Sequence, residues 1–313
     1  MKILVTGGAG FIGSTLVPQL LAKNHQVRVL DKLIYNQTTL FPHFLNPNFE
    51  FIEGDIRQEN TVKTALKEIE FVVHLAAIVG APACKKDERS SWEINYEAAC
   101  LINKLRGQIP LFFPSSTSGY GTRQAISGLC TEETPQEPIS LYGKSKAEAE
   151  KAILDQGNCV TYRFATGYGI SPRLRLDLMP NDFVFKAVKN KTLVVFERHF
   201  KRAFIHVQDM AKSIIFAIEN FDKIKNNAYN CGSEEANFTK EELCLRIQKQ
   251  VDYVLFFSDK DFDPDKRNYQ ISFAKIKQAG FNLSIDIDNG ISELIKAFSC
   301  LKINSDFANV EYY

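Results

Sequence analysis

The sequence lacks the patterns that bind metals or form disulfides. Its seven cysteines are an odd number, spread from Cys84 to Cys300 without a CxxC pair, and its five histidines do not pair at the spacing of metal ligands. A disulfide framework or a zinc site needs such patterns. We therefore expect reduced thiols, a cytoplasmic location and no bound metal.

Long hydrophobic runs are also absent. No stretch reaches the roughly 18 uncharged apolar residues that a membrane-spanning helix needs. The chain begins MKILVTGGAGFIG, in which glycines from Gly7 onward interrupt the apolar run. A secretory signal needs an apolar region of about 7–15 residues before its cleavage site. We expect neither a membrane partner nor secretion.

Charge of neither sign dominates. Lys and Arg number 38, Asp and Glu number 37, and the formal net charge is +1. This balance argues against a nucleic-acid partner and against an acidic solvating tail. Hydrophobic residues make up 45% and charged residues 24% of the chain, which is an ordinary globular composition. Its 313 residues are enough for about two domains.

Short apolar runs alternate with longer helical stretches through the first half of the chain. The runs are rich in Val, Ile and Phe, and several are apolar throughout, as in a sheet covered on both faces. This alternation predicts an α/β Rossmann fold, a doubly wound parallel sheet. The predicted strands are Lys2–Thr6, Gln26–Leu30, Asn48–Glu53, Phe71–His74, Pro110–Phe113 and Cys159–Phe164. The predicted helices are Phe11–Lys23, Glu59–Glu68, Ser91–Leu105 and Leu141–Gln156.

The pattern becomes less regular after about residue 167. We expect residues 1–166 to form the Rossmann domain, which also receives about 203–231, and residues 167–313 to form mainly a smaller, irregular substrate-binding domain. Irregular segments are indicated at Gly169–Pro172, Met179–Pro180 and Asp259–Lys266. Further helices are predicted over Val207–Asn220, Thr239–Gln250 and Asn289–Lys302, and a further strand over Ala228–Cys231.

A glycine-rich turn follows the first predicted strand and opens the first predicted helix. It carries glycines at Gly7, Gly10 and Gly13. In a dinucleotide site the first glycine permits a tight turn, the second lets the backbone approach the pyrophosphate, and the third lets helix and strand pack closely. The helix N-terminus presents free N–H groups to the phosphates. The place of this turn between strand and helix predicts a dinucleotide cofactor.

Asp31 ends the second predicted strand, 18 residues after Gly13. In dinucleotide sites an acidic residue about 20 residues further on holds the ribose hydroxyls, and its charge repels a 2′-phosphate. We therefore predict NAD rather than NADP. Lys32 is adjacent and would offset part of the repulsion, and a surface Asp that merely ends a strand is the alternative interpretation.

Tyr142 and Lys146 lie four residues apart on one face of a predicted helix. An ordinary phenol has a pKa near ~10 and is a poor base at neutral pH. A fixed ammonium nearby favours the phenolate and lowers that pKa. A run of hydroxyls, SSTSGYG from Ser115 to Gly121, follows the fifth predicted strand. Ligands of open α/β sheets bind beyond the carboxyl ends of the strands, where this run begins.

In their order along the chain, these motifs resemble those of the extended short-chain dehydrogenase/reductase family, in its nucleotide-sugar epimerase/dehydratase branch. The resemblance covers nearly the whole chain. The matching motifs are TGGAGFIG, Gly54-Asp55-Ile56, Leu75-Ala76-Ala77, Asn95, SSTSGYG, YGKSK, Arg163-Phe164-Ala165 and the stretch from Arg202 to Asp209.

The resemblance implies a role for each matching residue. Tyr142 would be the base that takes the proton from a sugar hydroxyl, Lys146 would tune Tyr142 and hold the nicotinamide ribose, and Ser116 would hydrogen-bond the reacting oxygen. NAD would be held by Gly7, Gly10, Phe11, Ile12, Gly13, Asp31, Asp55, Ile56, Leu75, Ala76, Ala77, Tyr142 and Lys146. A nucleoside diphosphate sugar would be bound by Thr117, Asn181, Arg202 and Arg267.

The resemblance narrows the reaction but leaves alternatives. The 4,6-dehydratases of the branch carry an Asp-Glu pair where this chain has Thr117-Ser118, which disfavours dehydration. We expect oxidation of a sugar hydroxyl, at C4, by hydride transfer to tightly bound NAD, within an epimerase cycle. Net 4-dehydrogenation is one alternative, and a non-catalytic NAD-binding sensor or scaffold is another. The first alternative comes from stretches that resemble GDP-manno-heptose 4-dehydrogenases, which are Val79–Pro82, Ile170–Asp177 and Asp263–Tyr269.

Two further expectations concern surfaces. Members of the family commonly pair through two helices, so the resemblance implies a homodimer formed by Ser91–Leu105 and Leu141–Gln156. Arg173 and Arg175 lie in a segment that reaches either the substrate or a partner subunit, and the sequence leaves both options open.

Overall fold

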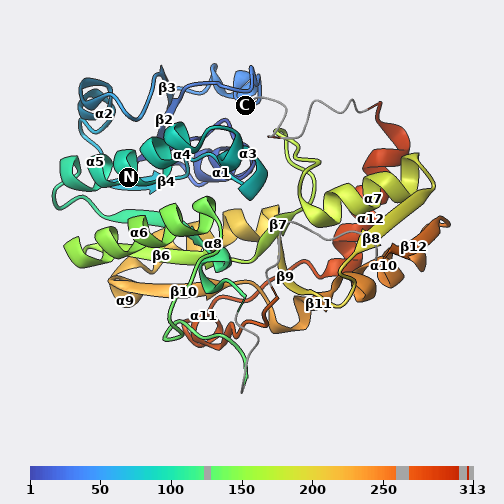
Figure 1. The fold of residues 1–313 in the computed structure, drawn as a ribbon. Coiled ribbons are helices and arrows are strands. Elements are labelled where there is room, and N and C mark those ends of the chain that lie inside the picture. The colour runs from blue at the N-terminus through green and yellow to red at the C-terminus, as the bar shows by residue number, and fades with distance from the viewer. Residues whose placement is uncertain (123–127, 259–267, 303–308, 310–313) are drawn as a thin grey trace.

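The computed structural model describes residues 1–122, 128–258, 268–302 and 309. Its largest element is a seven-stranded sheet in the order β3-β2-β1-β4-β5-β6-β10 (Figure 1). All neighbouring strands in it run parallel. The strands are β1 (Lys2–Thr6), β2 (Gln26–Asp31), β3 (Phe49–Glu53), β4 (Phe71–His74), β5 (Leu111–Ser116), β6 (Cys159–Phe164) and β10 (Asn227–Cys231). The doubly wound α/β fold predicted from the sequence is confirmed.

Helices cover both faces of the large sheet. Alternate residues of the strands serve the two faces: Ile3 and Val5 of β1 lie in the core on one side, whereas Leu4 lies in the core on the other. The first face is covered by α1 (Gly13–Ala22), α8 (Val207–Glu219), α9 (Phe221–Ile224) and α11 (Ala274–Gln278). The second face is covered by α2 (Glu59–Ala65), α5 (Ala98–Leu105) and α6 (Leu141–Gln156). This burial on both faces explains why several of the strands are almost entirely apolar.

The helix predicted over Ser91–Leu105 is interrupted. The chain forms α3 (Ala81–Lys86), then α4 (Glu88–Trp92), a π-helical turn over Glu93–Glu97 and finally α5. The π-helical turn buries Asn95, whose amide bonds both the N–H and the carbonyl of Ile78 at 2.8 and 2.9 Å. The turn therefore fixes the loop that follows β4.

The second half of the chain is more regular than the sequence predicted. It contains a three-stranded sheet of β7 (Thr166–Tyr168), β9 (Lys201–His206) and β11 (Asn237–Thr239), and a two-stranded sheet of β8 (Thr192–Phe196) and β12 (Val254–Ser258). The helices that pack with them around a separate core are α7 (Met179–Lys189), α10 (Lys240–Gln248) and α12 (Ile287–Cys300). The short 3₁₀ segments are Phe41–His43, Thr117–Tyr120 and Glu234–Ala236.

The Met179–Pro180 pair does not mark an irregular segment, because it opens α7. Proline fits the first turn of a helix, where its missing N–H would have no partner. The strand predicted near Ala228–Cys231 is β10, at the edge of the large sheet, and α8 packs on that sheet. β9 instead belongs to the three-stranded sheet. The division at residue 166 stays a prediction.

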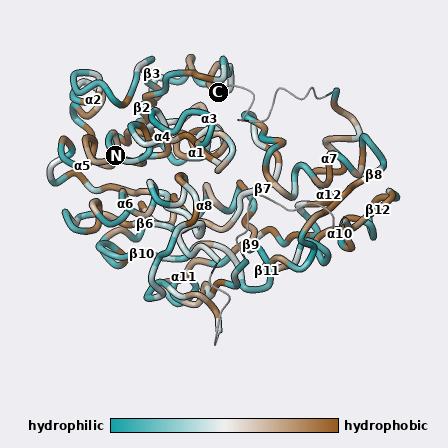
Figure 2. The backbone as a smooth tube through the Cα atoms, in the orientation of Figure 1, coloured by the Kyte–Doolittle hydropathy of each residue, from teal (hydrophilic) through white to brown (hydrophobic). Residues whose placement is uncertain are grey.

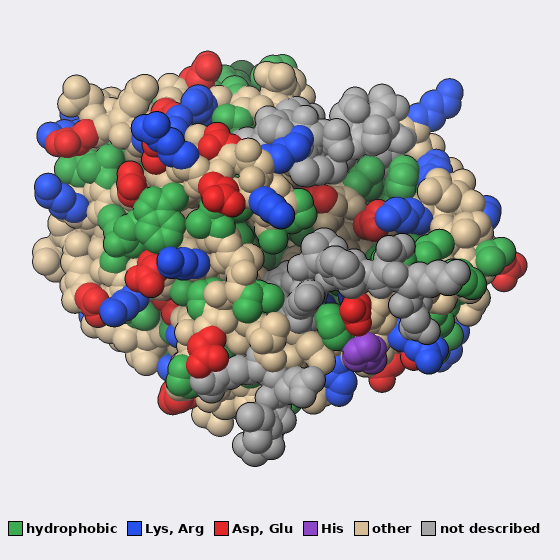
Figure 3. Space-filling model, in the orientation of Figure 1, with side chains coloured by type: hydrophobic (Ala, Val, Ile, Leu, Met, Phe, Trp, Pro, Cys, Tyr) green, Lys and Arg blue, Asp and Glu red, His purple; other side chains and the backbone are tan. Residues whose placement is uncertain are grey.

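Polarity is distributed as the fold requires. Hydrophobic residues lie along the strands and the inward sides of the helices, with hydrophilic segments at the periphery (Figure 2). Basic and acidic side chains are interspersed over the face in Figure 3. Within the described ranges, none of the helices combines the length and apolar character needed to cross a membrane. The same residues contain no group of three or more His, Cys, Asp or Glu side chains placed to hold a metal ion.

Candidate active site

The turn between β1 and α1 is packed so closely that Gly7 and Gly13 cannot carry side chains. Gly7 has a φ of +70°, and a Cβ there would lie 2.6 Å from the backbone nitrogen of Ala76. A Cβ on Gly13 would lie 2.5 Å from the Cα of Gly8. Gly10 is less confined, because its Cβ would meet only the Gly7 carbonyl, at 3.2 Å. Two of the three glycines are thus required by packing, and the middle one leaves a backbone surface open to a ligand.

Asp31 ties the end of β2 to this turn. Its Oδ2 accepts a hydrogen bond from the N–H of Ala9 at 2.9 Å, and its Oδ1 accepts one from the N–H of Leu33 at 2.8 Å. Burial raises the pKa of Asp31, although these backbone donors oppose the shift. A buried carboxylate beside the glycine turn is the arrangement that a ribose diol requires.

Asp55, which follows β3, is held by two cations. Lys32 lies 3.0 Å from its Oδ2 and Arg57 lies 2.7 Å from the same atom. Burial disfavours the charged form, but the hydrogen bonds from Arg57 and Lys32 prevail and hold the pKa of Asp55 well below its usual range. Arg57 also pairs with Glu93 at 2.9 Å. Ile56, the next residue, is buried in the core on the second face of the sheet.

The loop after β4 is fixed to β1 by a buried hydroxyl. Thr6 Oγ1 lies 2.6 Å from Nδ1 of His74 and accepts a hydrogen bond from the N–H of Ala76 at 3.3 Å. Leu75, Ala76 and Ala77 are half-buried at this point, at the carboxyl end of the strand. The order of the strands reverses between β1 and β4. On the β1 side of this point, at the start of α1, Phe11 is buried and Ile12 is half-buried.

Lys146 is a buried cation on α6. The residue is 3% exposed, and its Nζ lies 3.9 Å from the centroid of the Phe113 ring on β5. No acceptor in the described part of the chain hydrogen-bonds this ammonium. Burial lowers the pKa of Lys146 to about 7, and Glu150, one helical turn further on, opposes the shift. The ammonium is therefore a donor without an acceptor, beside the sheet edge where ligands are expected.

Tyr142 lies one turn before Lys146, near the N-terminus of α6. The Ser140 side chain caps this helix by accepting the N–H of Gly143 at 3.1 Å. Tyr142 packs against an apolar cluster that contains Ile78 and Ala83. A Cβ on Gly143 would lie 3.0 Å from the carbonyl of Ser118. The first turn of α6 therefore lies directly on the turn that ends β5.

The hydroxyl run occupies that turn. Ser116 ends β5, and its Oγ accepts the N–H of Ser118 at 3.1 Å and donates to Ser118 Oγ at 2.9 Å. Thr117 is 3% exposed and receives a hydrogen bond from Tyr269 at 3.4 Å. Since Phe113 and Ser116 lie on the same strand, the structure brings Ser116, Tyr142 and Lys146 to one edge of the sheet.

The predicted substrate residues have different surroundings. Asn181 is fully buried on α7, and its amide bonds the backbone of Gly169 at 2.9 and 3.1 Å and the carbonyl of Arg175 at 2.8 Å. Arg202 is 1% exposed on β9. Arg267 lies outside the described residues. Substrate contacts by these three residues stay predictions, and the position of Asn181 indicates that it also shapes the Gly169–Arg175 loop.

Arg173 and Arg175, which the sequence left undecided, both lie within the fold. The guanidinium of Arg173 stacks over the ring of Tyr35 at 4.3 Å, in the loop after β2. Arg175 reaches the loop after β4. No local sequence pattern indicates this placement, because Tyr35 and Val79 are far from the two arginines in the chain.

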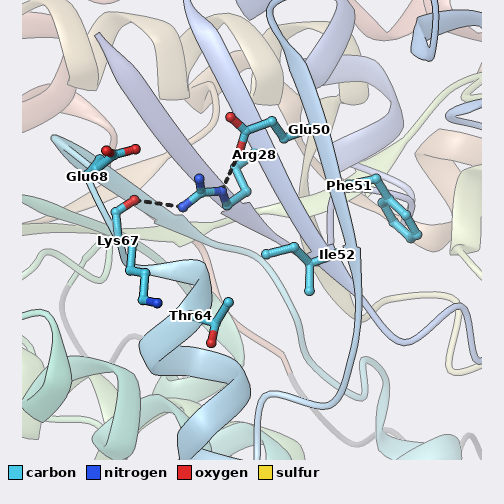
Figure 4. A pocket seen from close by; sticks show the side chains of 7 residues that line it. All are labelled: Arg28, Glu50, Phe51, Ile52, Thr64, Lys67 and Glu68. Carbon is cyan, nitrogen blue, oxygen red and sulfur yellow. Dashed lines mark hydrogen bonds and ion pairs between the residues drawn. The ribbon is translucent and has the colours of Figure 1, made fainter.

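A separate surface groove of about 810 Å³ lies away from these residues. It is lined by Arg28, Glu50, Phe51, Ile52, Thr64, Lys67 and Glu68 (Figure 4). Arg28 is satisfied there by Glu50 at 2.6 Å and by the carbonyls of Ala65 and Lys67 at 3.0 and 2.7 Å. In this groove Arg28 and Glu50 lie near the beginnings of β2 and β3, and Lys67 and Glu68 lie between α2 and β4. The groove is therefore at the end of the parallel sheet opposite to the usual ligand sites.

The residues at the carboxyl edge fit NAD. The glycine turn leaves a backbone cradle for a pyrophosphate, Asp31 is placed for a ribose diol, and the Lys146 ammonium lacks an acceptor that ribose hydroxyls would supply.

Comparison with known proteins shows the family. A sequence model described as the NAD dependent epimerase/dehydratase family matches residues 3–232. A UDP-glucose 4-epimerase of Corynebacterium glutamicum is 28% identical over 274 residues, which covers 79% of this chain and 80% of that protein. UDP-glucuronic acid decarboxylase 2 of Arabidopsis thaliana is 27% identical, covering 95% of this chain and 68% of that protein.

Solved structures show the same fold. The UDP-glucuronic acid 4-epimerase of Bacillus cereus, in complex with UDP-glucuronic acid and NAD, superposes with a TM-score of 0.83 at 24% identity. The match covers 95% of this chain and 99% of that one.

Proposed function

The chain belongs to the NAD dependent epimerase/dehydratase family, and we propose that it oxidises a hydroxyl at C4 of a nucleoside diphosphate sugar within an epimerase cycle. The observation that carries this proposal is the packing of α6 on the end of β5. That packing brings the phenol of Tyr142, the buried ammonium of Lys146 and the hydroxyl of Ser116 to the side of the sheet where the strands have their carboxyl ends, which is also the side of the glycine turn.

NAD supplies the hydride acceptor when it is bound. The Gly7–Gly13 turn and the N-terminus of α1 would hold its pyrophosphate, and Asp31 would hold the adenosine ribose. Asp55 and Ile56 would line the adenine pocket, and Leu75, Ala76 and Ala77 would pass beneath the cofactor. Lys146 would give its free donors to the nicotinamide ribose.

Tyr142 would take the proton from the sugar hydroxyl. A phenol with its ordinary pKa near ~10 is a weak base at neutral pH. The Lys146 charge, one helical turn away, favours the phenolate and so matches Tyr142 to the task. Ser116 would hydrogen-bond the reacting oxygen and orient it toward Tyr142.

The substrate diphosphate would be bound by residues of the second half of the chain. Arg202 offers a planar guanidinium suited to phosphate oxygens, and we assign Thr117, Asn181 and Arg267 to the same substrate. Residues 1–166 would bind NAD and residues 167–313 would mainly bind the sugar nucleotide. The proposed assembly is a homodimer paired through Ser91–Leu105 and Leu141–Gln156.

Dehydration is not part of the proposal. The positions that carry acids in 4,6-dehydratases hold Thr117 and Ser118, which are both buried hydroxyls. Neither can act as the acid that expels water at neutral pH.

Net 4-dehydrogenation is the second candidate. Two of the stretches that resemble GDP-manno-heptose 4-dehydrogenases lie against each other, since Arg175 Nη2 is 3.5 Å from the Val79 carbonyl. The third stretch lies outside the described residues over Asp263–Arg267. A non-catalytic NAD sensor is disfavoured, because a pure binder has no need of Ser116 and Tyr142.

A panel of UDP-, GDP-, CDP- and dTDP-sugars tests the proposal. With NAD-loaded protein, we expect one sugar nucleotide to be converted to its C4 epimer without lasting accumulation of NADH. Stoichiometric, sustained NADH formation would replace the epimerase with a net dehydrogenase. Failure of every sugar nucleotide to bind or react would overturn the proposed function.

A further inference from the structure

Arg175, which is buried, forms an ion pair with Asp177 in the loop that connects β7 to α7. Nη2 of Arg175 lies 2.6 Å from Oδ2 of Asp177, and Nε lies 3.1 Å from Oδ1. Their side chains are 9% and 23% exposed. The two bonds occupy one complete edge of the guanidinium, in the geometry of a bidentate pair.

This pair lies next to the surroundings of Tyr142. Nη2 of Arg175 is 3.5 Å from the carbonyl of Val79, and a Cβ on Gly80 would lie 3.7 Å from the same nitrogen. The residues on either side in the chain, Ile78 and Ala83, form the apolar cluster against which Tyr142 packs. Arg175 therefore contacts the same short loop as the proposed base.

The loop that carries the pair is rigidly held. The Asn181 amide bonds the N–H of Gly169 at 2.9 Å and the carbonyl of Arg175 at 2.8 Å. The N–H of Ile170 donates to Glu293 at 3.0 Å, and the Ser171 hydroxyl donates to the Phe11 carbonyl at 2.7 Å. These bonds fix the backbone at Arg175 and in the segment that precedes it.

One corner of the guanidinium is left for a ligand. Asp177 takes Nε and Nη2, and the second N–H of Nη2 faces Val79. No residue in the described part of the chain accepts a hydrogen bond from Nη1. Because Asp177 neutralises the charge, this corner is a hydrogen-bond donor in a site without net charge.

We propose that Arg175 and Asp177 are specificity-determining residues that select an uncharged sugar over a uronic acid at the substrate site. The inference rests on the proposed function. Nη1 of Arg175 donates to a single oxygen of the sugar, which a hydroxyl satisfies. A uronate carboxylate would seek a bidentate edge that Asp177 already fills, and it would meet the Asp177 charge.

The charge states support this assignment. Burial disfavours the carboxylate of Asp177, but Arg175 outweighs burial and holds the pKa of Asp177 below its usual range. Burial likewise opposes the Arg175 charge, but Asp177 outweighs it and raises the pKa of Arg175. Both groups therefore stay ionised at neutral pH, and their charges cancel.

The test compares matched neutral and uronate ligands on the NAD-loaded protein by calorimetry. The pairs are UDP-glucose with UDP-glucuronic acid and GDP-mannose with GDP-mannuronic acid. We expect the wild type to bind the neutral member more tightly. Asp177→Asn frees a charged guanidinium edge and should raise the affinity for the uronate, relative to its neutral partner, by about tenfold or more.

Two variants control this result. Asp288→Asn breaks the surface Arg246–Asp288 pair, which has the same 2.6 Å contact, and should leave the ratio unchanged. The double variant Arg175→Gln/Asp177→Asn also removes the guanidinium charge that Asp177→Asn leaves unpaired. It should therefore abolish the gain in relative affinity for the uronate. Arg175→Gln alone, if Asp177→Asn fails to fold, should weaken the neutral sugar about tenfold while NAD affinity holds.

The outcomes separate the two proposals. This inference alone is overturned if the wild type binds the uronate as tightly as the neutral sugar. It is also overturned if Asp177→Asn leaves the affinity ratio unchanged, or if Arg175→Gln leaves the affinity for the neutral sugar unchanged. Absence of binding by every sugar nucleotide overturns the proposed function, and the inference with it.

Discussion

The ammonium of Lys32 forms an ion pair with Asp55, 3.0 Å from its Oδ2, and not with Asp31, the neighbour of Lys32 in the sequence. Among the described residues, Asp55 is its ion-pair partner. Asp31 instead accepts two backbone N–H groups. The positive charge next to Asp31 in the sequence is therefore paired with Asp55, and we expect it to offset little of the repulsion between Asp31 and a 2′-phosphate.

Asp31→Asn tests this division. We expect the variant to bind NAD about tenfold more weakly and to lose most of its discrimination against NADP, because a charged hydrogen-bond acceptor is removed. Isothermal titration with both cofactors measures the change. Lys32→Ala is the matched control, and its NADP-to-NAD ratio should stay close to that of the wild type. A larger change of the ratio in Lys32→Ala than in Asp31→Asn would contradict this assignment.

The glycine turn separates folding from cofactor binding. Gly13→Ala places a methyl group against the backbone of Gly8, which cannot move aside, so we expect a loss of about 1–3 kcal/mol or more in the free energy of unfolding. Gly10→Ala meets only the Gly7 carbonyl at 3.2 Å and should stay close to wild-type stability. It should nevertheless lose NAD affinity, since its methyl group faces the pyrophosphate cradle.

Urea unfolding and NAD titration of both glycine variants check the contrast. Binding of NAD by Gly10→Ala with wild-type affinity would contradict the assignment of Gly10 to the pyrophosphate cradle. Unfolding of Gly13→Ala at the same urea concentration as the wild type would show that its methyl group is accommodated.

Lys146 should make the stability of the NAD-free protein depend on pH. Burial lowers its pKa from 10.5 to about 7, so between these values the unfolded chain binds a proton that the folded chain does not. The cost of burying the charged amine is therefore full below about pH 7, and it falls as the pH rises towards about 10.5. Lys146→Met does not carry this cost and should be more stable than the wild type, on the order of a few kcal/mol near pH 7.

The measurement is urea unfolding of both proteins across this pH range without NAD. The advantage of Lys146→Met should shrink as pH rises. Lys144→Met alters an exposed lysine on the same helix and should show no such trend. A difference between Lys146→Met and the wild type that is independent of pH would show that the buried amine is not titrating as described.

The large sheet was predictable because its strands are buried on both faces. Three strands match their predicted bounds, which are Lys2–Thr6, Phe71–His74 and Cys159–Phe164. Continuous runs of β-branched and aromatic residues are typical of strands buried on both faces. The second half was predicted less well. Its strands are short, β8 buries only alternate residues, and Pro180 was interpreted as a helix breaker although it occupies the first turn of α7.

The site shows a similar division. The predictions for Gly7 and Tyr142 came from the placement of local motifs, the first between a strand and a helix and the second on the helix before the sixth strand. These motifs come together at the carboxyl ends of the strands, and the roles of the two residues stay predictions. The contact of Arg175 with Val79 joins positions 96 residues apart, and no periodicity indicates it. The hydrogen bonds of Asn181 to the Gly169–Arg175 loop were likewise visible only in three dimensions.

The rate of sugar oxidation in a single turnover by Tyr142→Phe tests the central claim most directly. With NAD and the identified sugar nucleotide both saturating, we predict that the variant forms the oxidised sugar about 10²–10⁴-fold more slowly than the wild type. Its affinity for NAD should stay near that of the wild type, because Phe keeps the ring that packs against Ile78 and Ala83. Oxidation at the wild-type rate would contradict the assignment of Tyr142 as the base.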